Sequence, residues 1–296
     1  MEIKERIQPY MAKHYDGGAA GFYSPPKLKI DIPKSEDGKW VSENDYWENY
    51  YGHPDFNYEW NNGILEEKAV SNLKGYDLFD WFAGVIKQFL ITSLQGRLVG
   101  LEIGFKLSLN NKKKTVRKPD LALIHIDNPV QMSPEDRTYA GCFDMCFEIL
   151  SDSTKKAKEN DTVVKKTEYN QFGVKEYYIL DEKGKETAFY KLNKNGIYTK
   201  IRPFRGGIIK SSVLKGFQFR KEDLYLRPDL KDLINDPVYK NYVLLDYQKK
   251  CEEVEAAIKR ADAEKKKANA ERKRAEKAEL KVQELLKRLQ KYEEIK

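Results

Sequence analysis

Two acidic residues stand in apolar stretches of the chain, and this placement constrains the fold more than any other feature of the sequence. Glu148 lies in the middle of FDMCFEILS, and Asp120 opens the apolar run in KPDLALIHI. Such runs are typical of strands that are buried on both faces of a sheet. An ionised carboxylate is costly to bury unless a partner or a metal ion compensates its charge. The fold must therefore bring positive charge to these strands.

The elements around the two acidic runs predict an α/β domain. Residues 76–94 place apolar side chains at helical spacing, and a second helix is expected over 160–172, closed by Gly173. Strands are expected at 98–109, at the two acidic runs, at VKEYYILD, TAFYKL and GIYTKI, and in a hairpin, YEWNNGILEEKAV, that turns at 61–63. This order of elements indicates a mixed central sheet flanked by helices.

Composition divides the chain into three parts. Residues 1–40 are rich in Gly, Pro, Lys and aromatic residues without periodicity, and we interpret them as an N-terminal arm. Residues 41–232 hold the expected strands and helices of the folded domain. Residues 233–296 are interpreted as a linker and a long charged helix, because the chain beyond Asp246 contains no Gly or Pro and is dominated by Ala, Glu, Lys and Arg.

The expected C-terminal helix carries a sparse apolar stripe. Small or apolar residues recur every seven positions, and Leu285 and Leu286 widen the stripe near its end; the repeat consists of Val254, Ala261, Ala268, Ala275, Val282 and Leu289. This pattern is typical of a coiled coil, through which the chain would form a homodimer. A solvated single helix held by Glu and Lys pairs is the alternative, and both interpretations stay open at this point.

Net charge and hydropathy narrow the classes of partner. The chain has 54 basic and 47 acidic residues, a net charge of +7 that suits a polyanion but is also common in proteins without one. The lysine-rich turn from Lys112 to Lys118 is the candidate surface for nucleic acid. No run is long and apolar enough for a membrane span, and the N-terminus lacks the apolar stretch of a signal peptide. We therefore expect a cytoplasmic protein without a membrane partner.

The two acids predict a metal site at one edge of the sheet. Strand alternation places Glu148 on the same face as Cys146 and Leu150, and Asp120 opens a neighbouring strand, so the two carboxylates are expected to converge. Paired Asp and Glu oxygens suit a hard cation such as Mg²⁺, or Mn²⁺, which also binds phosphate.

The helix after the second acidic strand adds a cation to this pair. Asp161, Lys165 and Tyr169 are four residues apart and therefore lie on one helix face. A lysine on that face would approach the two acids. Phosphodiester hydrolysis needs this combination, since a metal ion polarises the phosphate and a nearby cation stabilises the developing negative charge.

The same residues resemble a known family. KPD, FEILSDST and the spaced pattern D-x-x-x-K-x-x-x-Y-x-x-x-G-V-x-E-Y, which runs from Asp161 to Tyr177, closely resemble the Uma2 family of restriction endonucleases. That family belongs to the PD-(D/E)xK nuclease superfamily. A weaker likeness begins at YEWNNGILEE and extends to VLKGFQFRKEDL, so it covers roughly residues 45–230.

The resemblance implies a restriction-endonuclease-like core and a Mg²⁺-dependent endonuclease, or one using Mn²⁺, that hydrolyses DNA. The implied catalytic residues are Asp120, Glu148 and Lys165. Asp120, Glu148 and the backbone carbonyl of Ile149 would be the metal ligands. Lys165 would take the role of the motif lysine, because Leu150 occupies the position two residues after Glu148 where the superfamily carries lysine.

Three further residues are candidates for an auxiliary role in the site: Glu59, Asp161 and Lys166. Each candidate also has a purely structural interpretation. Asp120 would start a strand after a proline, and Glu148 would be a buried acid paired with Arg or Lys. Asp161 would favour the helix N-terminus, Lys165 would be solvated, and Glu59 would lie at a hairpin edge.

A second function is consistent with the same features. The chain would then be a catalytically inactive module on a nuclease-like fold that binds nucleic acid through Lys112–Lys118 or interacts through its C-terminal coiled coil. Binding of that kind rests on phosphate contacts and weakens steeply with salt.

Overall fold

The structure is a computed structural model that describes residues 33–100, 102–109, 112–150 and 154–293. It divides into the units Met1–Ser35 and Glu36–Lys296, and all elements named below belong to the second unit. Residues 1–32 of the predicted N-terminal arm lie outside the described residues. Near the end of that predicted arm, Trp40 forms a β-bridge with Ile64 of the first hairpin.

The strands form three sheets. A five-stranded sheet has the order β2 (Ile64–Glu67), β1 (Tyr58–Asn61), β5 (Lys114–Arg117), β4 (Gly104–Ser108) and β7 (Thr138–Tyr139). A six-stranded sheet has the order β11 (Tyr198–Lys200), β10 (Ala188–Leu192), β9 (Glu176–Asp181), β8 (Met145–Leu150), β6 (Leu121–His125) and β3 (Gly96–Val99). A small third sheet pairs β12 (Ile208–Lys210) with β13 (Gln218–Arg220).

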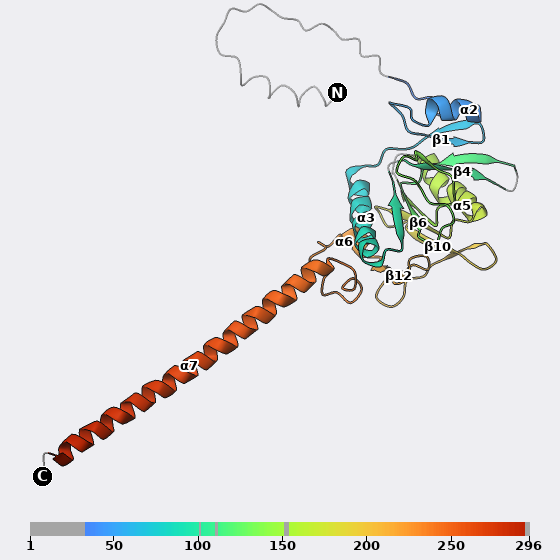
Figure 1. Cartoon of the computed structure of the whole chain (residues 1–296). Coiled ribbons are helices and arrows are strands. Elements are labelled where there is room, and N and C mark those ends of the chain that lie inside the picture. The colour runs from blue at the N-terminus through green and yellow to red at the C-terminus, as the bar shows by residue number, and fades with distance from the viewer. Residues whose placement is uncertain (1–32, 101, 110–111, 151–153, 294–296) are drawn as a thin grey trace, which may run out of the picture. The chain divides into compact units, whose positions relative to one another are not determined.

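The six-stranded sheet is mixed, as expected, and its centre is buried on both faces. β8 runs parallel to β9 and antiparallel to β6, and every residue of β8 and β9 is buried. One face packs on helix α3 (Leu73–Ser93) through an apolar cluster that includes Phe82 and Phe147. The other face packs on helix α5 (Lys166–Phe172) through a cluster that includes Cys146 and Tyr169. Figure 1 shows α3 and α5 on opposite sides of β6.

The helix between β8 and β9 is longer than the expected one and irregular. It begins with α4 (Lys155–Glu159), which the Thr154 side chain caps by accepting the Ala157 N–H. It continues as a π-helical segment, η2 (Asn160–Lys165), and ends as α5. Gly173 closes α5 with a φ of 98°, a left-handed conformation that glycine adopts without strain. The expected closing glycine is therefore confirmed, and the helix begins at Lys155, earlier in the chain than the expected start at 160.

The expected hairpin is confirmed with its turn. β1 and β2 pair from Tyr58↔Glu67 to Asn61↔Ile64, so the turn consists of Asn62 and Gly63, both with positive φ. A short helical segment, α2 (Glu43–Asp45) followed by η1 (Tyr46–Tyr50), packs on this hairpin through an aromatic cluster.

Two expectations for residues 98–118 are wrong. The stretch 98–109 is not one strand, because β3 ends at Val99 and β4 begins at Gly104 in a different sheet. The basic turn is largely strand β5, and Arg117 and Lys118 are buried against the hairpin and helix residues described below. Of this segment's basic residues, Lys112 and Lys114 are exposed. The proposed nucleic-acid surface therefore loses Arg117 to internal ion pairs and Lys118 to internal hydrogen bonds.

The chain continues through the short helix α6 (Asp223–Leu226) to helix α7 (Leu245–Glu293), shown in orange and red in Figure 1. This confirms the mixed α/β fold with a long C-terminal helix. The expected apolar stripe of α7 is exposed at Val254, Val282 and Leu289. No helix in the described part of the chain is long and apolar enough to cross a membrane.

Candidate active site

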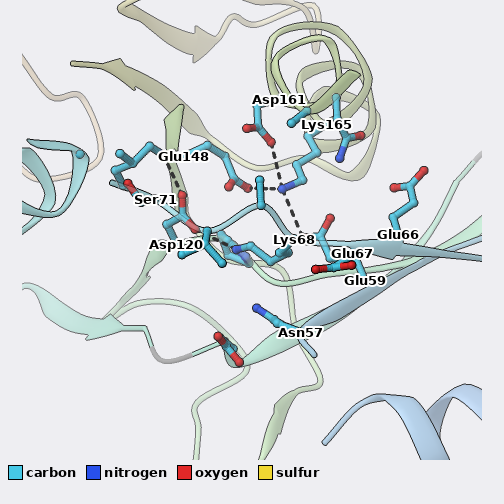
Figure 2. Close-up of a pocket in the computed structure, with 18 of the residues that line it drawn as sticks. Asn57, Glu59, Glu66, Glu67, Lys68, Ser71, Asp120, Glu148, Asp161 and Lys165 are labelled. Atoms are coloured by element: carbon cyan, nitrogen blue, oxygen red, sulfur yellow. Dashed lines mark hydrogen bonds and ion pairs between the residues drawn. The ribbon is translucent and has the colours of Figure 1, made fainter. Parts of the chain in front are cut away.

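The two acids lie side by side, Asp120 directly before β6 and Glu148 within β8. Leu121 pairs with Phe147, so Asp120 and Glu148 come next on adjacent strands. The Ile149 N–H donates to Oδ2 of Asp120 at 2.8 Å, which ties the start of β6 to β8. Asp120, Glu148 and Ile149 line a cavity of about 390 Å³, drawn in Figure 2.

Glu148 points to the face of the sheet that the second helix covers. It shares this face with Cys146 and Leu150, as strand alternation predicts, and only 1% of its surface is exposed. Its Oε1 accepts a hydrogen bond from the Tyr169 hydroxyl at 3.0 Å. Tyr169, which lies four residues after Lys165 in α5, therefore helps to hold the carboxylate that the lysine also contacts.

Lys165 lies among three carboxylates. Its Nζ is 3.2 Å from Oε1 of Glu148, 3.2 Å from Oε1 of Glu59 and 3.0 Å from Oδ1 of Asp161. The Lys165 side chain is 3% exposed, so the solvated-lysine interpretation is wrong. Figure 2 shows its ammonium directed into the cluster from the helix.

The position of Lys165 follows from the π-helical segment at whose end it stands. Asp161 lies in the same segment, and the two side chains form an i, i+4 ion pair. Asp161 is not the cap of this helix, since Thr154 caps α4 seven residues earlier. The Tyr177 hydroxyl donates to the Asp161 carbonyl at 2.8 Å and fixes the segment to β9. Single π-helical turns are frequent at functional sites.

Glu59 connects the cavity to a buried ion cluster. Its Oε1 accepts the Lys118 N–H at 2.8 Å, and its Oε2 accepts from Arg117 at 3.0 Å. Arg117, which is fully buried, also contacts Glu66 and forms two bonds to Glu168 on α5, at 2.6 and 3.0 Å. Glu59 is thus a fully paired interior acid rather than a solvent-facing hairpin edge residue.

Lys68 is a residue of this cavity that sequence reasoning missed. It follows β2 directly, and its Nζ donates to Oδ1 of Asp120 at 2.8 Å and to the Lys118 carbonyl. A lysine after the acidic pair of ILEEK resembles any surface lysine in the sequence. Only the pairing of β1 with both β2 and β5 brings it next to the start of β6.

Electrostatics in the cavity reflect a surplus of acids. Burial raises the pKa of Glu148 to about 8; the charge of Lys165 opposes this rise, and the charges of Asp120 and Asp161 add to it. Burial would also raise the pKa of Glu59, but Lys165 and Arg117 lower it to about 2. The carboxylates raise the pKa of Lys165 well above its usual value although burial opposes this. Lys165 is therefore held as a cation.

Lys166 lies outside this cluster. Its ammonium is 5.2 Å from the centre of the Tyr190 ring, and it lines a separate hollow with Tyr198. The structure thus separates the two neighbouring lysines, because successive residues of a helix point in different directions. We leave Lys166 out of the proposed site.

The donor set of the cavity fits a hard cation. In the portion of the chain that is described, no group of three or more His, Cys, Asp or Glu side chains is placed to hold a metal ion. Mg²⁺ does not require such a group, since it keeps several waters and is often bound by one or two carboxylates. Asp120 and Glu148 supply two such groups side by side on neighbouring strands, and both line the cavity.

Comparison with known proteins agrees with the resemblance seen in the sequence. One solved structure similar to this chain is that of a putative nuclease from Anabaena variabilis, with 12% identity, coverage of 63% of this chain and 98% of that one, and a TM-score of 0.49. A search of curated proteins found no match. The family model of Uma2, described as a putative restriction endonuclease, matches residues 44–224. Since this match spans more than half of the 296 residues, the chain belongs to the Uma2 family.

Proposed function

We propose that this protein is a metal-dependent endonuclease that hydrolyses phosphodiester bonds of DNA. The observation that carries the proposal is the meeting of three side chains from separate elements. Asp120, just before β6, lies beside Glu148 within β8, and the Lys165 ammonium is 3.2 Å from Glu148. Membership of a family of putative restriction endonucleases supports the same assignment.

The residues that line the cavity have different roles in the proposed reaction. Asp120 and Glu148, with the Ile149 carbonyl, would hold Mg²⁺ or Mn²⁺, which supplies phosphate polarisation and water activation when bound. Lys165 supplies a fixed positive charge close to the reacting phosphate, where it stabilises the negative charge that develops during hydrolysis.

Two further acids act as positioning residues. Glu59 and Asp161 contact the Lys165 ammonium at 3.2 and 3.0 Å, so they hold its long side chain in one direction. A fixed charge requires no reorganisation at the moment of reaction, which is the usual source of its catalytic benefit. These acids are expected to affect turnover through the placement of Lys165.

Cleavage of DNA with and without a divalent cation tests this proposal. With Mg²⁺ or Mn²⁺, the wild-type protein should convert supercoiled plasmid to nicked or linear forms, and Asp120→Ala and Glu148→Ala should abolish this while circular dichroism stays unchanged. Lys165→Met should lower the rate by roughly 10²–10³-fold. Glu276→Gln, on the exposed surface of α7, is the matched acid-to-neutral control. The assignment is wrong if wild type cuts neither DNA nor RNA, or if the two alanine variants cut normally.

We also propose that α7 pairs with α7 of a second copy of the chain. Its seven-residue repeat leaves Val254, Val282 and Leu289 more than half exposed, and Leu285 and Leu286 are exposed beside them. Burial of such a stripe against a copy of itself is the usual reason for a sustained heptad repeat. A binding module centred on Lys112–Lys118 has less support, because Arg117 and Lys118 are buried.

A further inference from the structure

Lys68 and Lys165 enter the same cavity but are held differently. Lys165 contacts three carboxylates, is 3% exposed and does not bond to Asp120. Among the residues that the structure describes, the carboxylate within ion-pair distance of Lys68 is that of Asp120; Lys68 also donates to the Lys118 carbonyl, and its side chain is 13% exposed. Figure 2 shows the two ammonium groups reaching the cluster from different elements, with Lys68 directed at Asp120.

The contacts of Asp120 leave Lys68 where an incoming cation would bind. Oδ2 of Asp120 accepts the Ile149 N–H at 2.8 Å, which is a backbone contact fixed by β8. Oδ1 accepts the Lys68 ammonium at 2.8 Å. A divalent cation beside Oδ1 would lie within a few ångströms of that ammonium, where two positive charges repel strongly in a partly buried setting.

We propose that Lys68 is a resident cation of the metal site: its ammonium neutralises Asp120 when no metal is bound, and a divalent cation must displace it to bind. The inference rests on the proposed function, since it presupposes that Asp120 is a metal ligand. Lys68 weakens metal binding and keeps the metal-free site neutral enough to stay folded.

The lysine side chain allows this exchange. Lys68 follows the end of β2 and reaches Asp120 through four flexible methylene groups, so it can move into solvent without a change in the backbone. Lys165 has no comparable freedom, because three carboxylates from a strand of each large sheet and from the helix hold it. The two lysines therefore have separate roles, one displaceable and one fixed.

Titration of the full-length protein with Mn²⁺ alone, at fixed pH and ionic strength, tests the competition by isothermal calorimetry. Lys68→Met and Lys68→Gln should both lower the Kd for Mn²⁺ at least about fivefold, the usual lower bound for coupling between two interacting ligands. Lys156→Met is the control, because its ammonium is exposed and pairs with Asp37 outside the cavity. Asp120→Asn should remove the binding and so identify the site.

Thermal stability gives a second readout. Without metal, Lys68→Met should melt at a lower temperature than wild type, because Asp120 loses its counterion. Addition of Mn²⁺ should then raise the melting temperature of Lys68→Met more than that of wild type, since stabilisation by a ligand grows with its affinity for the folded state.

The possible results separate the two proposals. If wild type binds Mn²⁺ and both Lys68 variants bind it equally or more weakly, Lys68 positions Asp120 instead of competing, and only this inference is overturned. If Lys68→Met tightens binding but Lys68→Gln does not, charge is not the cause, and the inference again fails alone. If neither wild type nor the variants bind Mn²⁺, or if Asp120→Asn binds it as wild type does, the metal site of the proposed function fails as well.

Discussion

Replacement of Arg117 by methionine should destabilise the protein more than any surface substitution of the same kind. The guanidinium is fully buried and donates four hydrogen bonds to carboxylates of Glu59, Glu66 and Glu168. Methionine keeps much of the volume but leaves these acids without their shared cation. Loss of one partner from a buried ion pair costs about 3–5 kcal/mol, mainly because the remaining charge stays buried.

The size of this loss follows from what the three acids retain. Glu59 keeps Lys165 and Glu168 keeps Lys113, so the variant retains partial compensation and should still fold. We therefore expect a loss of about 3–5 kcal/mol, which corresponds to a decrease in melting temperature of roughly 6–20 °C for a domain of this size.

Urea unfolding and differential scanning calorimetry measure this loss. Arg272→Met is the matched control, because Arg272 is 80% exposed and pairs with Glu276 on the surface of α7. That change should cost less than about 0.5 kcal/mol. If Arg117→Met costs no more than about 1 kcal/mol beyond the control, the cluster is not a stabilising part of the fold and the reasoning is refuted.

The remaining predictions concern pH, backbone geometry and assembly. Glu168 is buried, and Arg117 lowers the pKa of its carboxyl group against the effect of burial. The contribution of Glu168 to stability is therefore present above the unfolded-state pKa near 4.5 and is lost as pH falls through the lower folded-state pKa. The midpoint of urea unfolding of Glu168→Gln should be lower than that of wild type at pH 7 and should fall less on acidification. Gly63→Ala should lower the free energy of unfolding by about 1–3 kcal/mol, because φ is 103° at this position. Gly84→Ala, where the added methyl group meets no neighbour on α3, should raise it by about 0.5–1 kcal/mol in the same unfolding assay. Equal effects of the two substitutions would contradict this. Val282→Lys with Leu289→Lys should convert a dimer to a monomer in light scattering, and a dimer that survives both changes would exclude pairing through this stripe.

Features that depend on local spacing were predictable from the sequence. The Asn62–Gly63 turn, the closing Gly173 and the shared face of Asp161 and Lys165 each depend on residues a few positions apart. Family membership was also predictable, because the motif is carried by residues close together in the chain.

Features that depend on distant pairing were not predictable. Lys68 reaches Asp120 across 52 positions, and Arg117 reaches Glu59 across 58. Local sequence shows only polar residues at both places. The error over residues 112–118 has the same origin. A basic turn on the surface and a strand that buries a basic side chain among distant acids have the same local sequence, so the sequence does not distinguish them.

The charge balance of the cavity bears on how a nucleic acid would approach it. The residues that line it include seven acids and two lysines: Glu59, Glu66, Glu67, Glu102, Asp120, Glu148, Asp161, Lys68 and Lys165. The net charge of +7 of the chain is therefore not located here. Arg117 adds one positive charge beside Glu59 and Glu66, so an excess of negative charge remains. A phosphate backbone would be repelled by such a cavity. In the proposed function, a bound divalent cation would therefore reduce this repulsion as well as serve the reaction, and the proposed displacement of Lys68 would couple the two effects.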